Sequence, residues 1–276
     1  MPPEDKGTGQ ATGFRAILFI AFRWMQAGRG GAHRSRLLFA SLGIAAGIAT
    51  LLAVLSVMNG FQRHYMETLI ETSSFHVRAD VRPGLSQEAI KQLLASLSEQ
   101  PEVRSVLPFA ETSMIVTDTR FGRQTVAKVL IVDFEQLAND AGFIGSLGLD
   151  RAAIARLGDE GAMIGVELAR QLQIEQNSSI LLKGAAVSEE EGLVPYAAQV
   201  AASTIFKSGY YDVDAGLILL SAQTAAREGV PYVHPTTLGI KLLHAEGDAR
   251  FLMKLGHSVD GTLQHIESWR EYNRSF

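Results

Sequence analysis

Residues 37–61 read LLFASLGIAAGIATLLAVLSVMNGF, an apolar run without a single charged side chain. As an α-helix the run is roughly 37 Å long at about 1.5 Å per residue, against about 30 Å for the hydrocarbon core of a bilayer. A signal peptide has a shorter apolar region and ends in a small-x-small cleavage site, and neither feature is present here. The run therefore predicts an uncleaved transmembrane helix that continues to residue 72 as a stalk, with a signal peptide or a buried core helix as alternatives.

The charge of the chain changes sign across this run. Residues 1–36 carry six Lys or Arg and two Asp or Glu, whereas residues 63–276 carry 19 and 27, so the formal net charge of -4 averages two unlike regions. Because basic residues favour the cytoplasmic side, we expect the N-terminus in the cytoplasm and the later residues outside it. The acidic outer part argues against a nucleic-acid partner. The lack of cysteine excludes disulfides and thiolate metal sites.

Two further helical features accompany the predicted span. Residues 14–25 read FRAILFIAFRWM, with Arg15 and Arg23 on one side of a helix and apolar side chains on the other. This pattern is typical of a helix at the membrane interface, although the first helix of a globular core can share it. Within the span, Gly43 and Gly47 form a G-x-x-x-G pair. The pair predicts close packing of another membrane helix, or reflects the general tolerance of glycine in such helices.

The remainder of the chain predicts a mixed α/β domain. From their alternation and apolar runs, strands are expected at 75–81, 103–108, 112–119, 125–132, 162–165, 179–182, 200–206, 215–220 and 237–243. Helices are expected after an N-cap at Ser86, as two weak pieces within 134–157, and at 166–173, 223–228, 249–255 and 265–273. Residues 183–195, KGAAVSEEEGLVP, predict a solvated loop.

No pattern in the sequence indicates catalysis, a metal or a cofactor. The chain has no G-x-x-x-x-G-K-[ST] phosphate loop and no G-x-S-x-G serine motif, and its seven histidines lack metal-site spacing. Asp212 and Asp214, in GYYDVDAG, are expected on one face of a strand at about 7 Å, which fits a carboxylate pair or a solvated turn. We therefore expect a protein without enzymatic activity of its own.

Four stretches, in order along the chain, resemble one family of membrane proteins. They are Leu55–Phe61 (LSVMNGF), Ala162–Leu172 (AMIGVELARQL), Phe206–Leu217 (FKSGYYDVDAGL) and Ser268–Asn273 (SWREYN). The chain resembles the LolC/LolE family, the permease subunits of the lipoprotein-releasing ABC transporter, within the wider group of MacB- and FtsX-like permeases. It departs from the usual pattern at residues 176–178, where Gln-Asn-Ser replaces a Gly-Asp turn.

The resemblance implies an α+β membrane protein that is the N-terminal part of a four-span permease, either as a fragment or as the product of a split gene. It implies an interfacial helix and one transmembrane helix, followed by a mixed α/β periplasmic domain with a porter-like layer and an inserted β-rich lobe. The expected parts are a cytoplasmic tail and interfacial helix (1–36), a transmembrane helix and stalk (37–72), a porter-like subdomain (73–134 plus 198–276) and the lobe (135–197).

The function implied by the resemblance is extraction of lipoproteins from the bacterial inner membrane and their transfer to a periplasmic carrier. A separate cytoplasmic ATPase and a second permease subunit, identical or paralogous, would be the partners. The resemblance places the lipoprotein cavity at Val54, Val57, Met58 and Phe61, for which ordinary contact with membrane lipid is the alternative. It places a carrier-docking loop at Gly192, Leu193, Val194 and Pro195, for which a merely solvated loop is the alternative.

Two other functions stay open at this point. One is a MacB- or FtsX-like permease that moves a different substrate or only transmits force to a periplasmic partner. The other is a single-pass sensor or adaptor whose outer domain only binds. A membrane-anchored hydrolase is disfavoured because the sequence offers no catalytic residues.

Overall fold

The computed structural model describes residues 16–17, 19–20, 23, 31–158, 160–188, 192–231, 235–244, 247–258 and 261–274. The chain divides into two compact units, residues 1–63 and 64–276, and each is described by itself below. Of the helix predicted at 14–25, only residues 16, 17, 19, 20 and 23 are described, and these are helical. The rest of that prediction lies outside the described residues.

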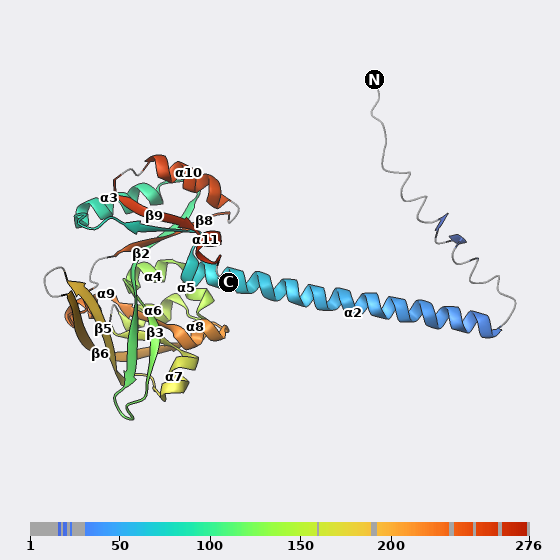
Figure 1. Cartoon of the computed structure of the whole chain (residues 1–276), viewed down its shortest axis with the longest axis horizontal. Helices are drawn as coiled ribbons and strands as arrows, with labels where there is room; N and C mark the ends of the chain where they lie inside the picture. Colours follow the sequence, from blue (N-terminus) through green and yellow to red (C-terminus); the bar gives the residue numbers. More distant parts are fainter. Residues whose placement is uncertain are drawn as a thin grey trace, which may run out of the picture. The chain divides into compact units, whose positions relative to one another are not determined.

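The first unit contains most of α2 (Gly31–Leu69), a helix of 39 residues (Figure 1). Together with the turn that follows, it is the one described helix that is long and apolar enough to cross a membrane. None of its most apolar window is buried within the chain. The prediction of a long apolar helix over 37–61 is confirmed, and the helix extends beyond both ends of that run.

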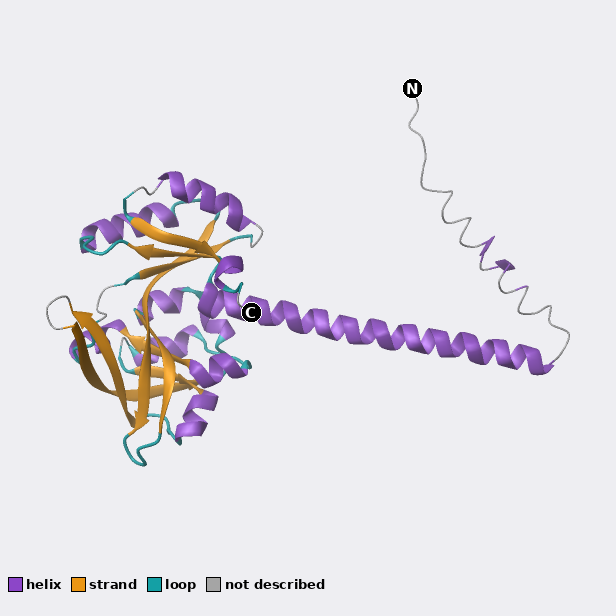
Figure 2. Cartoon of the chain, viewed as in Figure 1, coloured by secondary structure: helices purple, strands orange, loops and turns teal. Residues whose placement is uncertain are grey.

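In the second unit, six strands pair in a closed ring (Figure 2). Each strand of the ring has two neighbours, in the order β2-β3-β7-β4-β6-β5 and back to β2. Their bounds are β2 Val103–Asp118, β3 Gln124–Val132, β4 Ala162–Gly165, β5 Ser179–Ser188, β6 Gly192–Phe206 and β7 Leu217–Ser221. The result is a small closed barrel.

Side chains fill the interior of this barrel. Alternate residues of each strand point inward, as with Met114 and Val116 on β2 and Val129 on β3, all of them buried. Two helices, α7 (Val166–Leu172) and α9 (Ala222–Arg227), add buried side chains to the same core. The barrel is therefore a packed support and not a ligand cavity.

The N-terminal half of β2 leaves the barrel and joins a second sheet. There it pairs with β8 (Thr237–Leu242), which pairs with β1 (Val77–Val81), which pairs with the edge strand β9 (Leu263–Ser268). Helices α3 (Gln87–Ser98) and α10 (Asp248–Ser258) lie together over this sheet in Figure 1 and share its core. The side chain of Ser86 caps α3, as predicted.

A third cluster of buried side chains lies outside the barrel. It joins Phe75, Phe109 and Tyr210 to three short helices that follow one another, α4 (Phe134–Asn139), α5 (Ala141–Ser146) and α6 (Arg151–Leu157). Helix α8 (Tyr211–Gly216) contributes Val213 to the same cluster.

The strands predicted at 103–108 and 112–119 are both present but continuous, because β2 pairs with β8 along one half and with β3 along the other. Two other predictions of local structure are wrong. The predicted helix at 265–273 begins as strand β9, because these residues pair with β1; helix α11 (Trp269–Tyr272) starts only after Ser268. The GYYDVDAG stretch forms helix α8, so Asp212 and Asp214 do not share the face of a strand.

The predicted loop at 183–195 is wrong for its described residues, since 183–188 and 192–195 belong to the paired strands β5 and β6; residues 189–191 lie outside the described residues. Ala185 pairs with Pro195 and Ser188 with Gly192, which extends β5 and β6 as a two-stranded ribbon. Along this part of β6 the described strands supply only β5 as a neighbour, and strand proline is tolerated at such an edge. The predicted division into 73–134 plus 198–276 and 135–197 remains a proposal; the barrel takes strands from both segments.

Candidate functional site

The four predicted cavity residues all lie exposed on α2. Val57 is 73% exposed, and Val54, Met58 and Phe61 are exposed to between 53% and 65%. A Cβ atom built on Gly43 or Gly47 meets no described atom within 4 Å. These side chains and glycines therefore form an outward surface of the helix, available to lipid, to cargo or to a second helix.

The predicted docking residues lie at the start of β6, on one arm of the β5–β6 hairpin. Leu193 is 71% exposed, although it is a large apolar side chain on a narrow ribbon. Gly192 has a φ of 74°, in the left-handed region that glycine adopts without strain. The structure thus corrects the form of this segment from loop to hairpin; its role stays a prediction.

The C-terminal end of α2 and the turn after it are held by hydrogen bonds and ion pairs. After Leu69 the helix widens into a π-helical turn, η1 (Ile70–Ser74), a conformation that often marks functional positions. The hydroxyl of Thr72 donates to the carbonyl of Thr68 at 2.7 Å, and the hydroxyl of Ser74 donates to that of Leu69 at 3.1 Å. The stalk predicted to end at residue 72 therefore ends in a turn locked by its own side chains.

An ion cluster binds this turn to β2 and β8 of the second sheet and to the start of α5. The Nζ of Lys241, on β8, lies 2.8 Å from Glu71 Oε2 on η1 and 2.8 Å from Asp140 Oδ2 at the start of α5. Arg104 Nη2, from β2, lies 2.5 and 2.7 Å from the two oxygens of Glu71. Lys241 is fully buried and Asp140 is 4% exposed. Two basic side chains face two carboxylates, and this pairing offsets the cost of burying the charges. The Arg104 side chain is 38% exposed and that of Glu71 15% exposed. Burial lowers the pKa of Lys241, although Asp140 and Glu71 act to raise it.

Asp140 also organises the backbone around the cluster. Its second oxygen caps α5 by accepting the N–H of Phe143 at 3.0 Å, and Ser105 Oγ donates to Oδ2 at 3.0 Å. Burial acts to raise the pKa of Asp140, but Lys241 and these donors outweigh it, so the pKa lies below its ordinary value. Asp140 therefore stays ionised. Gly142 completes the site, because a Cβ there would strike the carboxylate of Glu71.

His76 lies beside the cluster as a neutral side chain. It is buried, and its Nδ1 accepts the backbone N–H of Leu242 at 3.1 Å. Burial lowers the pKa of His76, which favours the unprotonated ring that this hydrogen bond needs. A cation at this position would disturb the charge balance of the cluster.

Residues 209–212 (GYYD) form a turn that also contacts the end of α2. Tyr210 is 8% exposed, and its ring lies 5.3 Å from the ring of Tyr65 and 5.5 Å from that of His64, both at the end of α2. The buried carboxylate of Asp214 shapes the turn by accepting the N–H of Ser208 at 2.7 Å and of Gly209 at 3.2 Å. Asp214 is therefore structural, and the predicted pair with the exposed Asp212 does not exist.

We define the stalk anchor as Glu71, Arg104, Asp140, Tyr210 and Lys241. Among the described residues no group of three or more His, Asp or Glu side chains is placed to hold a metal ion. Every charged group of the anchor is already paired within the chain. What such an arrangement can do is mechanical, because it fixes η1 to strands β2 and β8 and to the start of α5. Sequence reasoning missed the anchor, although Lys241 inside the apolar strand TLGIKLL signals a buried partner.

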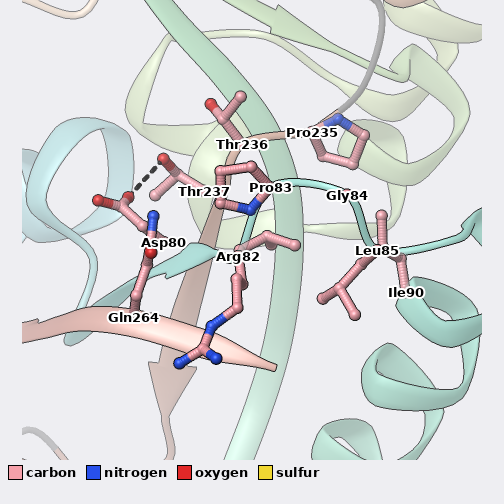
Figure 3. A pocket seen from close by; sticks show the side chains of 11 residues that line it. Asp80, Arg82, Pro83, Gly84, Leu85, Ile90, Pro235, Thr236, Thr237 and Gln264 are labelled. Atoms are coloured by element: carbon pink, nitrogen blue, oxygen red, sulfur yellow. Dashed lines mark hydrogen bonds between the residues drawn. The ribbon is translucent and has the colours of Figure 1, made fainter. Parts of the chain in front are cut away.

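A separate open pocket of about 520 Å³ lies at the end of β1 and the start of α3 (Figure 3). Its lining mixes Arg82 and Gln264 with the apolar Pro83, Leu85 and Pro235. The carboxylate of Asp80 accepts the hydroxyl of Thr237 at 2.9 Å, the bond drawn in the figure. This pocket contains no cluster of reactive groups and shares no residue with the stalk anchor.

Comparison with known proteins adds a family match. Residues 37–240 match the family model described as the MacB-like periplasmic core domain. Two curated proteins of Xylella fastidiosa are similar, both named lipoprotein-releasing system transmembrane protein LolC. That of strain Temecula1 is 24% identical over 216 residues, and that of strain 9a5c is 23% identical over 206 residues. Each match covers 74% of this chain and 49% of the relative, so the chain spans about half the length of these relatives.

Two solved structures show distant likeness. The periplasmic region of MacB from Actinobacillus actinomycetemcomitans has a TM-score of 0.40 and 9% identity, covering 75% of this chain and 94% of that one. The extracellular domain of the noncanonic ABC-type transporter YknZ from Gram-positive bacteria has a TM-score of 0.37 and 10% identity, covering 68% and 98%. Both scores are too low to add to the sequence match.

Proposed function

Because the chain belongs to the family of the MacB-like periplasmic core domain, we propose that it is the N-terminal part of an ABC transporter permease. The proposed cargo is a lipoprotein, extracted from the inner membrane and passed to a periplasmic carrier. The names of the two LolC relatives support this cargo, and the family match alone supports the broader class. ATP hydrolysis would belong to a separate cytoplasmic subunit.

The observation that carries the proposal is the course of α2. An exposed apolar helix long enough to cross a membrane ends in a turn whose Glu71 is ion-paired to Lys241 and Arg104. A helix end fixed in this way moves together with the strands β2 and β8 that hold it. Closure of an ATPase on the cytoplasmic side would thus reach the outer domain through α2. A sensor or adaptor that only binds has no comparable need for such an anchor.

The same proposal assigns a part of the chain to contact with the membrane, with the lipoprotein cargo and with the carrier. The basic residues before the apolar run support a cytoplasmic N-terminus and a periplasmic main domain. Val54, Val57, Met58 and Phe61 would line the lipoprotein cavity on the exposed surface of α2 near its outer end. Gly192, Leu193, Val194 and Pro195 would dock the carrier on the projecting β5–β6 hairpin, and Gly43 with Gly47 would pack against a helix of the second permease subunit.

A MacB-like permease with a different cargo is the second candidate, because the matching family model is described by MacB. In both candidates the stalk anchor and the membrane helix have the same role. The candidates differ in the cargo that contacts the outer end of α2. The cargo therefore decides between them, and the class of protein is tested separately.

The class is tested by recovering the tagged protein from native membranes with mild detergent. We expect an ATPase subunit and a second permease subunit to copurify with it. The Gly43→Leu, Gly47→Leu double variant should lose most of the second permease while remaining in the membrane, because leucine keeps the helix apolar but blocks close packing. Gly60→Leu on the same helix is the matched control and should recover both partners. Recovery of the wild-type protein without any ATPase would contradict the proposal and favour a single-pass sensor.

A further inference from the structure

The turn η1 and the short helix α11 meet at one buried side chain, Arg78 of β1. These two segments are far apart in the sequence, since η1 follows α2 and α11 is the last helix described (Figure 1). Arg78 is 8% exposed, although arginine is rarely buried unless all of its contacts are satisfied. Its neighbours therefore indicate what the side chain does.

The guanidinium group of Arg78 makes a different contact on each side. Nη1 donates to the carbonyl of Ser73, in the last turn of η1, at 3.1 Å. Nη2 donates to Glu111 Oε2, on β2, at 3.0 Å. The guanidinium carbon lies 4.4 Å from the ring centroid of Tyr272 on α11 and 5.3 Å from that of Phe109. One planar group thus joins η1, β2 and α11.

Tyr272 is held at a second point by the same network. Lys128, on β3, donates to the hydroxyl of Tyr272 at 3.1 Å and lies 3.0 Å from Glu111 Oε1. Helix α11 is also fixed through its backbone, because Trp269 N–H donates to the carbonyl of His76, the residue just before β1. Both the ring face and the hydroxyl of Tyr272 are therefore occupied by cations bound to one carboxylate.

We propose that Arg78 is a positioning residue that clamps η1 to α11, so that a displacement at the end of α2 is passed directly to α11. The role needs arginine, because a planar fork can donate in two directions while its face stacks on a ring, and a lysine ammonium cannot. In the proposed permease, a movement of the membrane helix would reach α11 through this clamp. That last step rests on the proposed function, whereas the clamp itself does not.

Pairs of spin labels test the clamp within the full chain in lipid nanodiscs. The chain has no cysteine, so Glu67→Cys on α2 and Arg274→Cys after α11, both exposed positions, give two unique labels. With Arg78 present we expect one narrow distance distribution by pulsed electron paramagnetic resonance. In Arg78→Met the narrow component should be lost to a broad distribution, and Arg78→Lys should restore it only in part.

Two further variants serve as a matched control and as a second, independent test of the clamp. Arg82→Met changes an exposed arginine just after the same strand and should leave the narrow distribution intact. Tyr272→Leu removes the ring while leaving both hydrogen bonds of Arg78 and should broaden the distribution even if Arg78→Met does not fold. A narrow distribution in folded Arg78→Met or in Tyr272→Leu, or equal broadening in Arg82→Met, would overturn the clamp. Because no ATPase or cargo is involved, a failure of the clamp is distinguishable from a failure of the proposed function.

Discussion

Replacing Lys241 with methionine is expected to destabilise the second unit (residues 64–276) by about 3–5 kcal/mol, the usual result of removing one partner from a buried ion pair. Lys241 is fully buried, and the variant would leave the carboxylate of Asp140 buried without its cation. Glu71 would keep only Arg104. Urea unfolding of the protein in detergent, followed by tryptophan fluorescence, measures the change in the free energy of unfolding.

The control for this variant is Lys254→Met. Lys254 also forms an ion pair, with Glu102 at 3.0 Å, but both side chains are about half exposed, so its removal should change stability little. Combining Lys241→Met with Glu71→Gln and Asp140→Asn should recover most of the lost stability, because no carboxylate then stays buried and asparagine can still cap α5. If Lys241→Met is as stable as Lys254→Met, the ion cluster does not hold the stalk.

Replacing Gly165 with alanine is expected to cost about 3 kcal/mol, at the upper end for overpacking a buried position. Gly165 lies between β4 and α7, where a Cβ would strike the carbonyl oxygen of Asp214 and lie 2.7 Å from its carbonyl carbon. The obstacle is backbone, which cannot rotate away as a side chain can. The helix that carries Asp214 would have to move, and with it the turn that places Tyr210 against the stalk.

The matched control is Gly216→Ala, at the end of the same helix α8. A Cβ at Gly216 meets no described atom within 4 Å, so alanine there should leave the free energy of unfolding nearly unchanged. The spectral readout is the near-ultraviolet circular dichroism of the tyrosines around the stalk, which should weaken in Gly165→Ala alone. An equal free energy of unfolding in the two variants would show that α8 leaves room for a side chain at Gly165.

The sequence predicts well those elements whose signal is local. The apolar run of α2, the cap at Ser86 and the strand-then-helix segment 162–173 depend on neighbouring residues, and the structure has all three. The sequence does not predict the strands at 183–188 and 192–195, because these segments are stabilised by pairing with each other and not by an alternating pattern. For the same reason β2 was divided in two, since partners on different sheets support its halves.

The stalk anchor could not be predicted from the sequence because its members come from distant segments. Glu71, Arg104, Asp140 and Lys241 lie on η1, on β2, before α5 and on β8, and no spacing in the sequence links them. Lys241 alone gave a signal, as a charge inside an apolar strand, but such a signal does not name the partner. The cavity residues were predicted from the family resemblance alone. In the single chain their side chains are exposed on the surface of α2.

The proposed function places a lipoprotein against the C-terminal end of the apolar run of α2 as it leaves the membrane. It is tested most directly by placing a photocrosslinking amino acid at Met58 in the intact transporter, isolated with its ATPase, and comparing it with the same amino acid at Phe39 near the inner end of the exposed helix. We expect a covalent adduct with an acylated lipoprotein at position 58, which disappears after ATP turnover, and none at position 39. An active complex that yields no lipoprotein adduct from position 58 would contradict it.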